Sequence, residues 1–311
     1  MVLPLLLDCD PGNDDAVGIL AAMGDPALRL LAVTTCFGHL SGARTAQNAA
    51  IAVAVGGGGV PVHRGADEPL KRERMVARFL DLETALDAER PDLPSVALSP
   101  ATSVEALSAA LAAEPGATIV TTGPLTNIAL LLERDRDARD RIGALISLSG
   151  AWGLGTKTPA AEWNVLSDPD AAAAVFSAGL DLTLIPVDAA VHVPIEAATI
   201  AALAALPGPV GGFAAELLRS LQAVHRAPPV GPAAAPLNDP CAVLVAAQPD
   251  LAETRPAQVT VDRRDGLTYG RTVFDFAGDH PNARVVTRID AAGLNRRLTE
   301  VVARLASRET A

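Results

Sequence analysis

Four aspartates lie within eight residues of the chain, in a predicted strand-to-helix turn: Asp8, Asp10, Asp14 and Asp15. The preceding segment Leu3–Leu7 predicts a buried strand, so Asp8 and Asp10, two residues apart, would point to the same side. Pro11–Gly12 turns the chain, and Asp14 and Asp15 then open a helix, whose free N–H groups favour negative charge. The segment therefore predicts a carboxylate cluster at the end of a strand.

Such a cluster indicates a metal site. Carboxylates this close together raise one another's pKa unless a cation lies among them. Ligation by oxygen alone favours calcium or magnesium over zinc. Taken separately, the Asp8-x-Asp10 pair could be structural and the Asp14-Asp15 pair could be a helix cap. Their combination in one turn favours the metal site.

Composition narrows the class of partner. The chain has 311 residues, half of them apolar, and a formal charge of −11, which opposes binding to nucleic acid or to an anionic membrane. No apolar run reaches the roughly 18 to 20 residues that span a bilayer. The N-terminus lacks the basic region of a signal peptide, and the odd set Cys9, Cys36 and Cys241 favours a reducing compartment. We therefore expect a cytoplasmic protein that acts on a small molecule.

Short apolar segments alternate with amphipathic ones, which predicts βαβ units and an open, mostly parallel α/β sheet flanked by helices. Predicted strands are Leu28–Cys36, Ala117–Thr121, Ala144–Leu148 and Leu182–Val187, and later a pair, Ala257–Asp262 with Leu267–Phe274. Predicted helices are Gly42–Val55, Ser103–Ala113, Pro124–Leu132, Ala171–Ala178, Ile195–Leu206, Phe213–His225, Cys241–Ala247 and Ala291–Leu305. We expect a single domain over residues 1–311, with 70–93 and 227–235 as loops or lids.

Ligands of open parallel sheets bind at the carboxyl ends of the strands. Four segments fall at or near such ends: Asp10, Gly123–Pro124, the loop after Leu148, and the predicted helix start at Asn238–Asp239. We therefore expect these segments to converge in space, although they lie far apart in the sequence.

The motif Asp8-x-Asp10-Pro11-Gly12-x-Asp14-Asp15-Ala16 resembles the signature of the inosine–uridine-preferring nucleoside hydrolases. Further landmarks of that family occur in the same order along nearly the whole chain: Thr122–Ala129, Thr158–Asn164, Asp168–Ala172 and Pro236–Pro240. The resemblance implies the Rossmann-like nucleoside hydrolase fold. It also implies hydrolysis of the N-glycosidic bond of a ribonucleoside or related riboside, and a homodimer or homotetramer.

The resemblance also assigns roles to residues. A calcium ion would be held by Asp10, Asp15, Asp239 and the backbone carbonyl of Thr126. Asp10 would also be the general base that takes a proton from the attacking water. The ribose hydroxyls would be bound by Asp14, Glu162 and Asn164, and Asp8 would support Asp10 from behind. Glu162 and Asn164 have a structural alternative, which is to cap the helix near Asp168.

The chain departs from the family around the leaving group and the sugar rim. Many members have histidine where this chain has Asn238, and asparagine cannot supply a proton at neutral pH. His39 and Thr156 stand where asparagines are usual. We therefore expect an aglycone or 5′ substituent other than that of inosine or uridine. Asn238 and His39 are the candidates for leaving-group activation, and Thr156 and His225 are candidate substrate contacts.

Two other functions are compatible with parts of the pattern. A nucleoside- or ribose-binding protein of the same fold would bind with calcium but release no sugar. A magnesium phosphohydrolase would use Asp8 as nucleophile, but it needs a downstream lysine, and neither Lys71 nor Lys157 opens a suitable motif. The Pro11–Gly12 turn and Asp239 are also unexplained by that chemistry.

Overall fold

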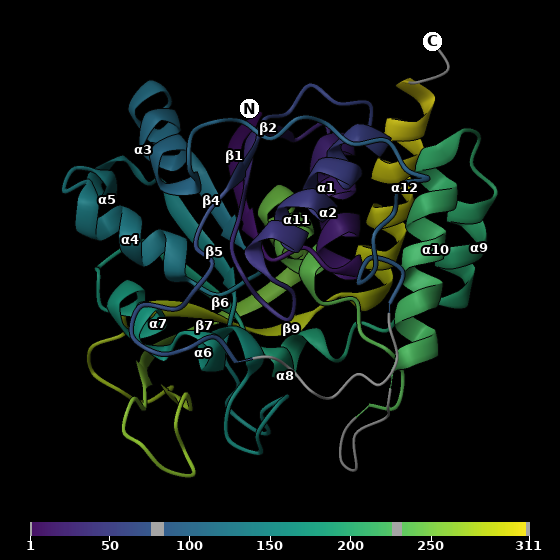
Figure 1. Ribbon diagram of the computed structural model, residues 1–311. Coiled ribbons are helices and arrows are strands. Elements are labelled where there is room, and N and C mark those ends of the chain that lie inside the picture. Colours follow the sequence, from purple (N-terminus) through teal and green to yellow (C-terminus); the bar gives the residue numbers. More distant parts are fainter. Residues whose placement is uncertain (1, 76–83, 226–231, 309–311) are drawn as a thin grey trace.

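The computed structural model describes residues 2–75, 84–225 and 232–308, and its centre is a nine-stranded sheet (Figure 1). In chain order the strands are β1 (Leu3–Cys9), β2 (Leu28–Thr35), β3 (Val62–Arg64), β4 (Thr118–Thr121), β5 (Ala144–Leu148), β6 (Leu182–Ile185), β7 (Ala252–Val261), β8 (Thr272–Asp275) and β9 (Ala283–Ile289). Across the sheet their order is β3-β2-β1-β4-β5-β6-β9-β7-β8. All neighbours from β3 to β9 are parallel, whereas β7 is antiparallel to β9 and β8. The predicted open, mostly parallel sheet is confirmed.

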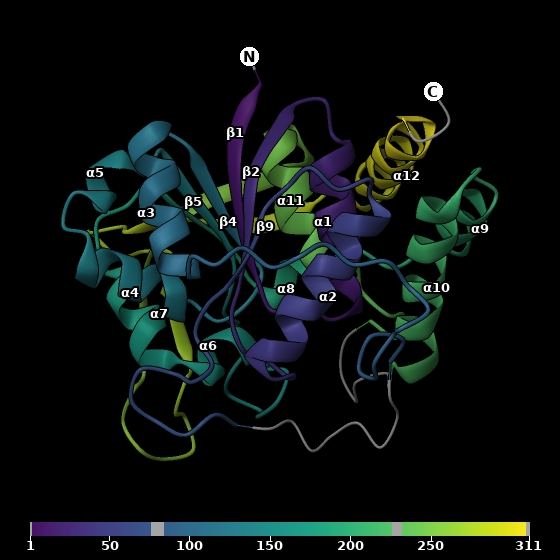
Figure 2. The same ribbon diagram turned by 45° about the horizontal axis from the view of Figure 1, so that its top comes forward.

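Helices cover both faces of the sheet (Figures 1 and 2). On one side lie α1 (Asn13–Gly24), α2 (Gly42–Val55), α9 (Ala197–Ala204), α10 (Pro209–Val224), α11 (Asp239–Ala247) and α12 (Ala291–Arg308). On the other lie α3 (Ser103–Ala113), α4 (Thr126–Arg134), α5 (Ala138–Arg141) and α7 (Pro169–Phe176). Short elements complete the connections: α6 (Trp163–Ser167), α8 (Val187–Ala190) and the 3₁₀ helix η1 (Pro249–Leu251). No helix within the described residues has the length and apolar character needed to cross a membrane.

Strand β1 contributes to a hydrophobic cluster on each face of the sheet. Leu5 and Leu7 pack on the side of α1, and Leu6 packs on the side of α4. This alternation follows from the two-residue period of a strand. It places Asp8 on the side of Leu6, where it is fully buried, and it makes β1 a strand without a solvent-exposed face.

The observed strands differ from the predicted ones in two respects. Strand β8 begins at Thr272 rather than Leu267, because Gly266 and Gly270 turn the chain with positive φ angles of 152° and 79°. Strands β3 and β9 were not predicted, and β9 joins the parallel and antiparallel parts of the sheet. Of the two predicted lids, residues 76–83 and 226–231 lie outside the described residues, and the described remainder contains no helix or strand.

Candidate active site and metal centre

A cavity of about 290 Å³ lies at the carboxyl end of β1. Its walls come from segments throughout the chain: Asp10, Gly12, Asn13, Asp14, Asp15, His39, Leu40, Thr84, Asp87, Thr122, Leu148, Ser149, Thr156, Lys157, Glu162, Trp163, Asn164, Val187, Leu221, Val224, Asn238 and Asp239. The predicted convergence of strand ends is therefore confirmed, because one cavity combines the ends of β1 and β5 with the start of α11.

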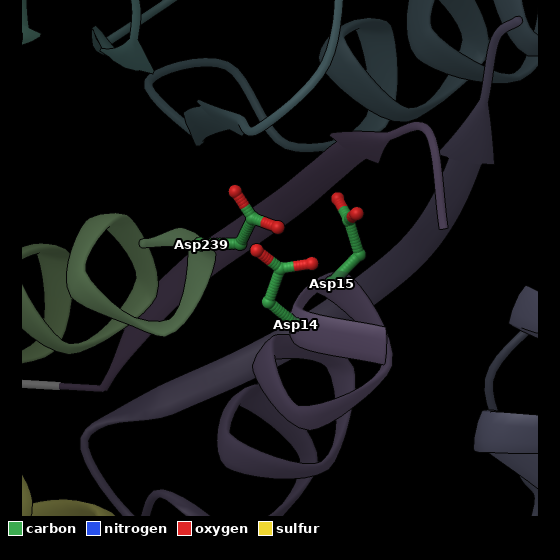
Figure 3. Close-up of side chains that lie close together, drawn as sticks. All are labelled: Asp14, Asp15 and Asp239. Atoms are coloured by element: carbon green, nitrogen blue, oxygen red, sulfur yellow. The ribbon is translucent and has the colours of Figure 1, made fainter. Parts of the chain in front are cut away.

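Three carboxylates meet where two helices begin. Asp14 and Asp15 lie in the first turn of α1, and Asp239 is the first residue of α11. One oxygen from each lies within 4.8 Å of the others. Figure 3 shows the Asp14 and Asp239 side chains directed toward each other, with Asp15 beside them. These three residues form a group that could hold a metal ion.

Asp10 is fixed in place by two close backbone approaches. A Cβ added to Gly38 would lie 1.7 Å from Oδ2 of Asp10, and one added to Gly123 would lie 2.7 Å from Oδ1. Both neighbouring positions therefore require glycine if the Asp10 carboxylate is to stay where it is. This contact also explains why Gly123, in the loop after β4, belongs to the site.

The carboxylates of the site hold their protons more strongly than usual. Burial raises the pKa of Asp10 and of Asp239 well above the ordinary value, and the neighbouring aspartates raise it further. Burial and the charge of Asp14 raise the pKa of Asp15 to about 6, and burial also raises the pKa of Asp14. These groups therefore favour a bound positive charge.

The residues present fit a hard cation. The described Arg and Lys side chains make no salt bridge to Asp10, Asp14, Asp15 or Asp239, so this part of the chain supplies no compensating charge through ion pairs. All four offer carboxylate oxygens, the donors that calcium and magnesium prefer. The structure thus brings the predicted ligands Asp15 and Asp239 together, and it adds Asp14 to that group.

Thr122, rather than Thr126, lies beside the carboxylates. The Thr122 hydroxyl donates to Oδ1 of Asp15 at 2.7 Å, and its carbonyl accepts from Nδ2 of Asn164 at 2.7 Å. Thr126 does not line the cavity; it begins α4, and its hydroxyl donates to Asp168 at 2.8 Å. The structure therefore does not bring Thr126 to the site, because the turn at Gly123 and Pro124 carries it away. The feature of the sequence that could have identified Thr122 as a site residue is its position directly after strand β4.

Glu162 and Asn164 are held at the start of α6 by backbone groups. The Glu162 carboxylate accepts from the N–H groups of Asn164 and Val165 and, across the loop, of Gly150. Nδ2 of Asn164 donates to the carbonyls of Thr122 and Leu148. Glu162 is thus the N-cap of α6, as the structural alternative supposed, although the capped helix is α6 and not α7. Both residues nevertheless line the cavity.

Asp8 lies beneath the cavity and not in its wall. It is fully buried, and its Oδ1 accepts from Thr34 Oγ1 at 2.6 Å and from Asn127 Nδ2 at 2.8 Å. Burial raises its pKa to about 7, against the opposing effect of these two hydrogen bonds. Asn127 also accepts from the Ala66 N–H, so the network links the end of β1 to the loop after β3.

The cavity wall includes an aromatic pair, His39 and Trp163. The rings of His39 and Trp163 stack with centroids 4.1 Å apart and planes 6° apart. Burial lowers the pKa of His39 to about 3, and the charge of Lys157 contributes in the same direction. The Thr156 hydroxyl accepts from the backbone N–H of Trp163 at 3.0 Å. His39 is therefore neutral near pH 7 and holds no proton that it would readily give up as an acid.

The last two predicted residues lie at the ends of helices. Asn238 is the N-cap of α11, lines the cavity, and has a buried Oδ1 without a hydrogen-bond partner among the described residues. His225 follows α10 and does not line the cavity, although Leu221 and Val224 of that helix do. The structure therefore brings Asn238, but not His225, to the site.

The chain is similar to known proteins over nearly its whole length. The model of the family described as inosine-uridine preferring nucleoside hydrolase matches residues 5–296. A pyrimidine-specific ribonucleoside hydrolase RihA from Shewanella sp. (strain MR-7) is 38% identical over 94% of each chain. The RihA of Citrobacter koseri is 36% identical over 99% of this chain and 100% of the relative.

The solved structures that resemble this fold are also nucleoside hydrolases. A purine-preferring ribonucleoside hydrolase from Gardnerella vaginalis superposes with a TM-score of 0.87 at 25% identity, covering 97% of this chain and 99% of its own. A plant nucleoside hydrolase, PpNRh1, superposes with a TM-score of 0.86 at 25% identity and the same coverage. The chain thus belongs to the inosine-uridine preferring nucleoside hydrolase family and is an N-glycosyl hydrolase of ribonucleosides.

Proposed function

We propose that this enzyme is a calcium-dependent hydrolase of a pyrimidine-type riboside, with Asp10 as general base. The observation that supports this most is the single cavity in which Asp10 joins Asp14, Asp15 and Asp239. A pyrimidine aglycone is supported by the relatives at 38% identity, whose names specify pyrimidine ribonucleosides. Asp10, Asp15 and Asp239 would hold the ion, with Asp14 beside them, and Thr122 replaces Thr126 in our proposal because of its contact with Asp15.

When bound, calcium supplies the positive charge that lowers the pKa of water and attracts the ribose hydroxyl oxygens. Asp10 takes one proton from the attacking water as the C1′–O bond forms and the bond from C1′ to the base breaks. The sugar passes through an oxocarbenium-like state, and the carboxylates of Asp14 and Glu162 stabilise its positive charge. Asn164 would position the sugar through its contacts with the strand ends.

The departing base must be stabilised without a histidine on α11. Asn238 can donate a hydrogen bond through its amide, but it supplies no proton near pH 7. His39, with its lowered pKa, is equally unsuited to protonate the base. We therefore propose that the preferred aglycone leaves readily as an anion or takes its proton from water, with Asn238 donating a hydrogen bond to it. We also propose a homodimer or homotetramer.

The test is release of free sugar from a panel of pyrimidine, purine, nicotinamide and modified-base ribosides, with calcium and with chelator. Wild type and Asp10→Asn are compared. We expect calcium-dependent release that Asp10→Asn lowers by about 10²- to 10⁴-fold, the range of a general base.

Asn238→His tests the leaving-group assignment on the same panel. It should raise kcat most for the ribosides with the most basic leaving groups, because imidazole can protonate them. Equal effects on all ribosides would contradict this role for Asn238. Absence of sugar release from the whole panel, by folded enzyme with bound calcium, would contradict the proposed substrate class.

A further inference from the structure

One side of the cavity is rich in hydrogen-bond donors. It is formed by His39 from the loop between β2 and α2, by Lys157 from the loop after β5, and by Trp163 at the start of α6; we refer to these three residues as the donor wall. The His39 and Trp163 rings stack, and Nζ of Lys157 lies 5.3 Å from the centroid of the Trp163 ring. Loops from two strands thus bring three nitrogen-bearing side chains together.

Two nitrogens of the donor wall are buried without a partner. Nε1 of Trp163 and Nδ1 of His39 have no hydrogen-bond partner among the described residues, and Trp163 is only 7% exposed. An indole N–H can only donate. Leaving such a group unpaired in the interior costs free energy, so an acceptor on the substrate is the expected partner.

Lys157 gives the donor wall its charge. Among the lining residues in the described part of the chain it is the one Lys or Arg, whereas the others include five Asp and one Glu: Asp10, Asp14, Asp15, Asp87, Asp239 and Glu162. A calcium ion would compensate the aspartates at the other end of the site. The Lys157 ammonium group interacts electrostatically with Glu162, and it is also suited to an anionic part of the substrate.

The opposite side of the cavity has a different character. Leu221 and Val224 of α10 line it together with Asn238, which suits the apolar face and polar edge of a base. In Figures 1 and 2, α6 and α10 lie on opposite sides of the end of β1. A riboside whose base faces α10 and whose 2′- and 3′-hydroxyls face the aspartates has one carbon left to direct at the donor wall, C5′.

We propose that the donor wall is a subsite for an anionic group on C5′, so that the preferred substrate is a 5′-phosphorylated riboside. This inference rests on the proposed function. Trp163 Nε1–H, the His39 ring N–H and the Lys157 ammonium donate to the phosphate oxygens. The reaction is otherwise the same: water adds at C1′, the base departs, and ribose 5-phosphate is released in place of ribose.

The test compares uridine with uridine 5′-monophosphate in the presence of calcium. Wild type should show the higher kcat/KM for the phosphorylated substrate. We define the ratio as kcat/KM for uridine 5′-monophosphate divided by kcat/KM for uridine. Lys157→Gln should lower this ratio by about tenfold or more, the effect of a lost charge-assisted hydrogen bond. Lys71→Gln is the matched control, because Lys71 lies outside this cavity and pairs with Asp170. It should leave the ratio as in wild type.

Trp163→Phe tests the donor wall independently, since it keeps an aromatic ring and removes the N–H. It should lower the same ratio about threefold to tenfold, the effect of one hydrogen bond. A wild-type preference for uridine, or a ratio that Lys157→Gln leaves unchanged, would overturn the subsite.

Binding separates this inference from the proposed function. With calcium present, ribose 5-phosphate should raise the thermal unfolding temperature of wild type more than ribose does, and Lys157→Gln should remove the difference. If neither nucleotide nor nucleoside is cleaved but this difference is observed, the subsite is supported and the proposed reaction is contradicted. If the two sugars act equally, the subsite is wrong, whatever the enzyme cleaves.

Discussion

The carboxylate of Asp10 occupies the space that a side chain at Gly38 would need, since a Cβ there would lie 1.7 Å from Oδ2. The residue proposed as general base is therefore positioned by the absence of an atom on the neighbouring loop. The same loop continues into His39, so the position of Asp10 and the donor wall depend on one short connection between β2 and α2.

Gly38→Ala should displace the Asp10 carboxylate and lower kcat by about 10²-fold, as expected for a displacement near 1 Å. Gly212→Ala is the control, because a Cβ there meets nothing within 4 Å. It should keep full activity and gain about 0.5 to 1 kcal/mol of stability, the usual benefit of alanine over glycine within a helix. Steady-state kinetics and urea unfolding measure both effects. Equal activity of the two variants would show that Gly38 does not position Asp10.

Thr122→Val and Thr126→Val each exchange one hydroxyl for a methyl group and separate the two threonines. Thr122→Val should weaken calcium binding about threefold to tenfold, because Asp15 loses a hydrogen bond. Thr126→Val should mainly lower stability, by about 1 to 3 kcal/mol, because Asp168 loses a hydrogen-bond donor. Calcium titration by calorimetry, with urea unfolding of both variants, checks the assignment, and the reverse pattern would contradict it.

Calcium should stabilise the folded protein, because Asp10 and Asp239 are buried carboxylates that make no salt bridge in the described part of the chain. At a calcium concentration 100-fold above Kd the gain is about 2.7 kcal/mol, and chelator should abolish it. Asp239→Asn should weaken binding at least about tenfold. The exposed Asp140→Asn is the matched control, with unchanged affinity. A melting temperature that calcium does not alter would contradict a site at these residues.

His39 should make the protein less stable in acid. Its pKa is lowered to about 3 in the folded state, so below about pH 6.5 the unfolded state binds a proton that the folded state does not. Stability is therefore lost as pH falls from about 6.5 toward 3. Between about pH 7.5 and about pH 5, wild type should lose about 2 kcal/mol more than His39→Gln, which cannot titrate. Urea unfolding of both proteins at the two pH values measures this difference, and equal losses would show that His39 is not buried as a neutral ring.

Local patterns predicted most of the sheet and its helices. The apolar run Leu3–Leu7, the Pro11–Gly12 turn and the acidic start of α1 all occur as expected. The same is true of α11, in which Asn238 occupies the N-cap position. Strand β9 was harder to predict, because its alternation is interrupted and its partners β6 and β7 lie far away along the chain.

The sequence by itself determined the strand-to-helix turn, the carboxylates that follow it and the family, because these depend on residues close together or on motifs in a fixed order. Only the tertiary structure decided which residues meet. It placed Thr122 rather than Thr126 beside Asp15, left His225 outside the cavity, and stacked His39 on Trp163. Contacts of this kind depend on how loops from different strands pack at one edge of the sheet, which spacing along the chain does not specify.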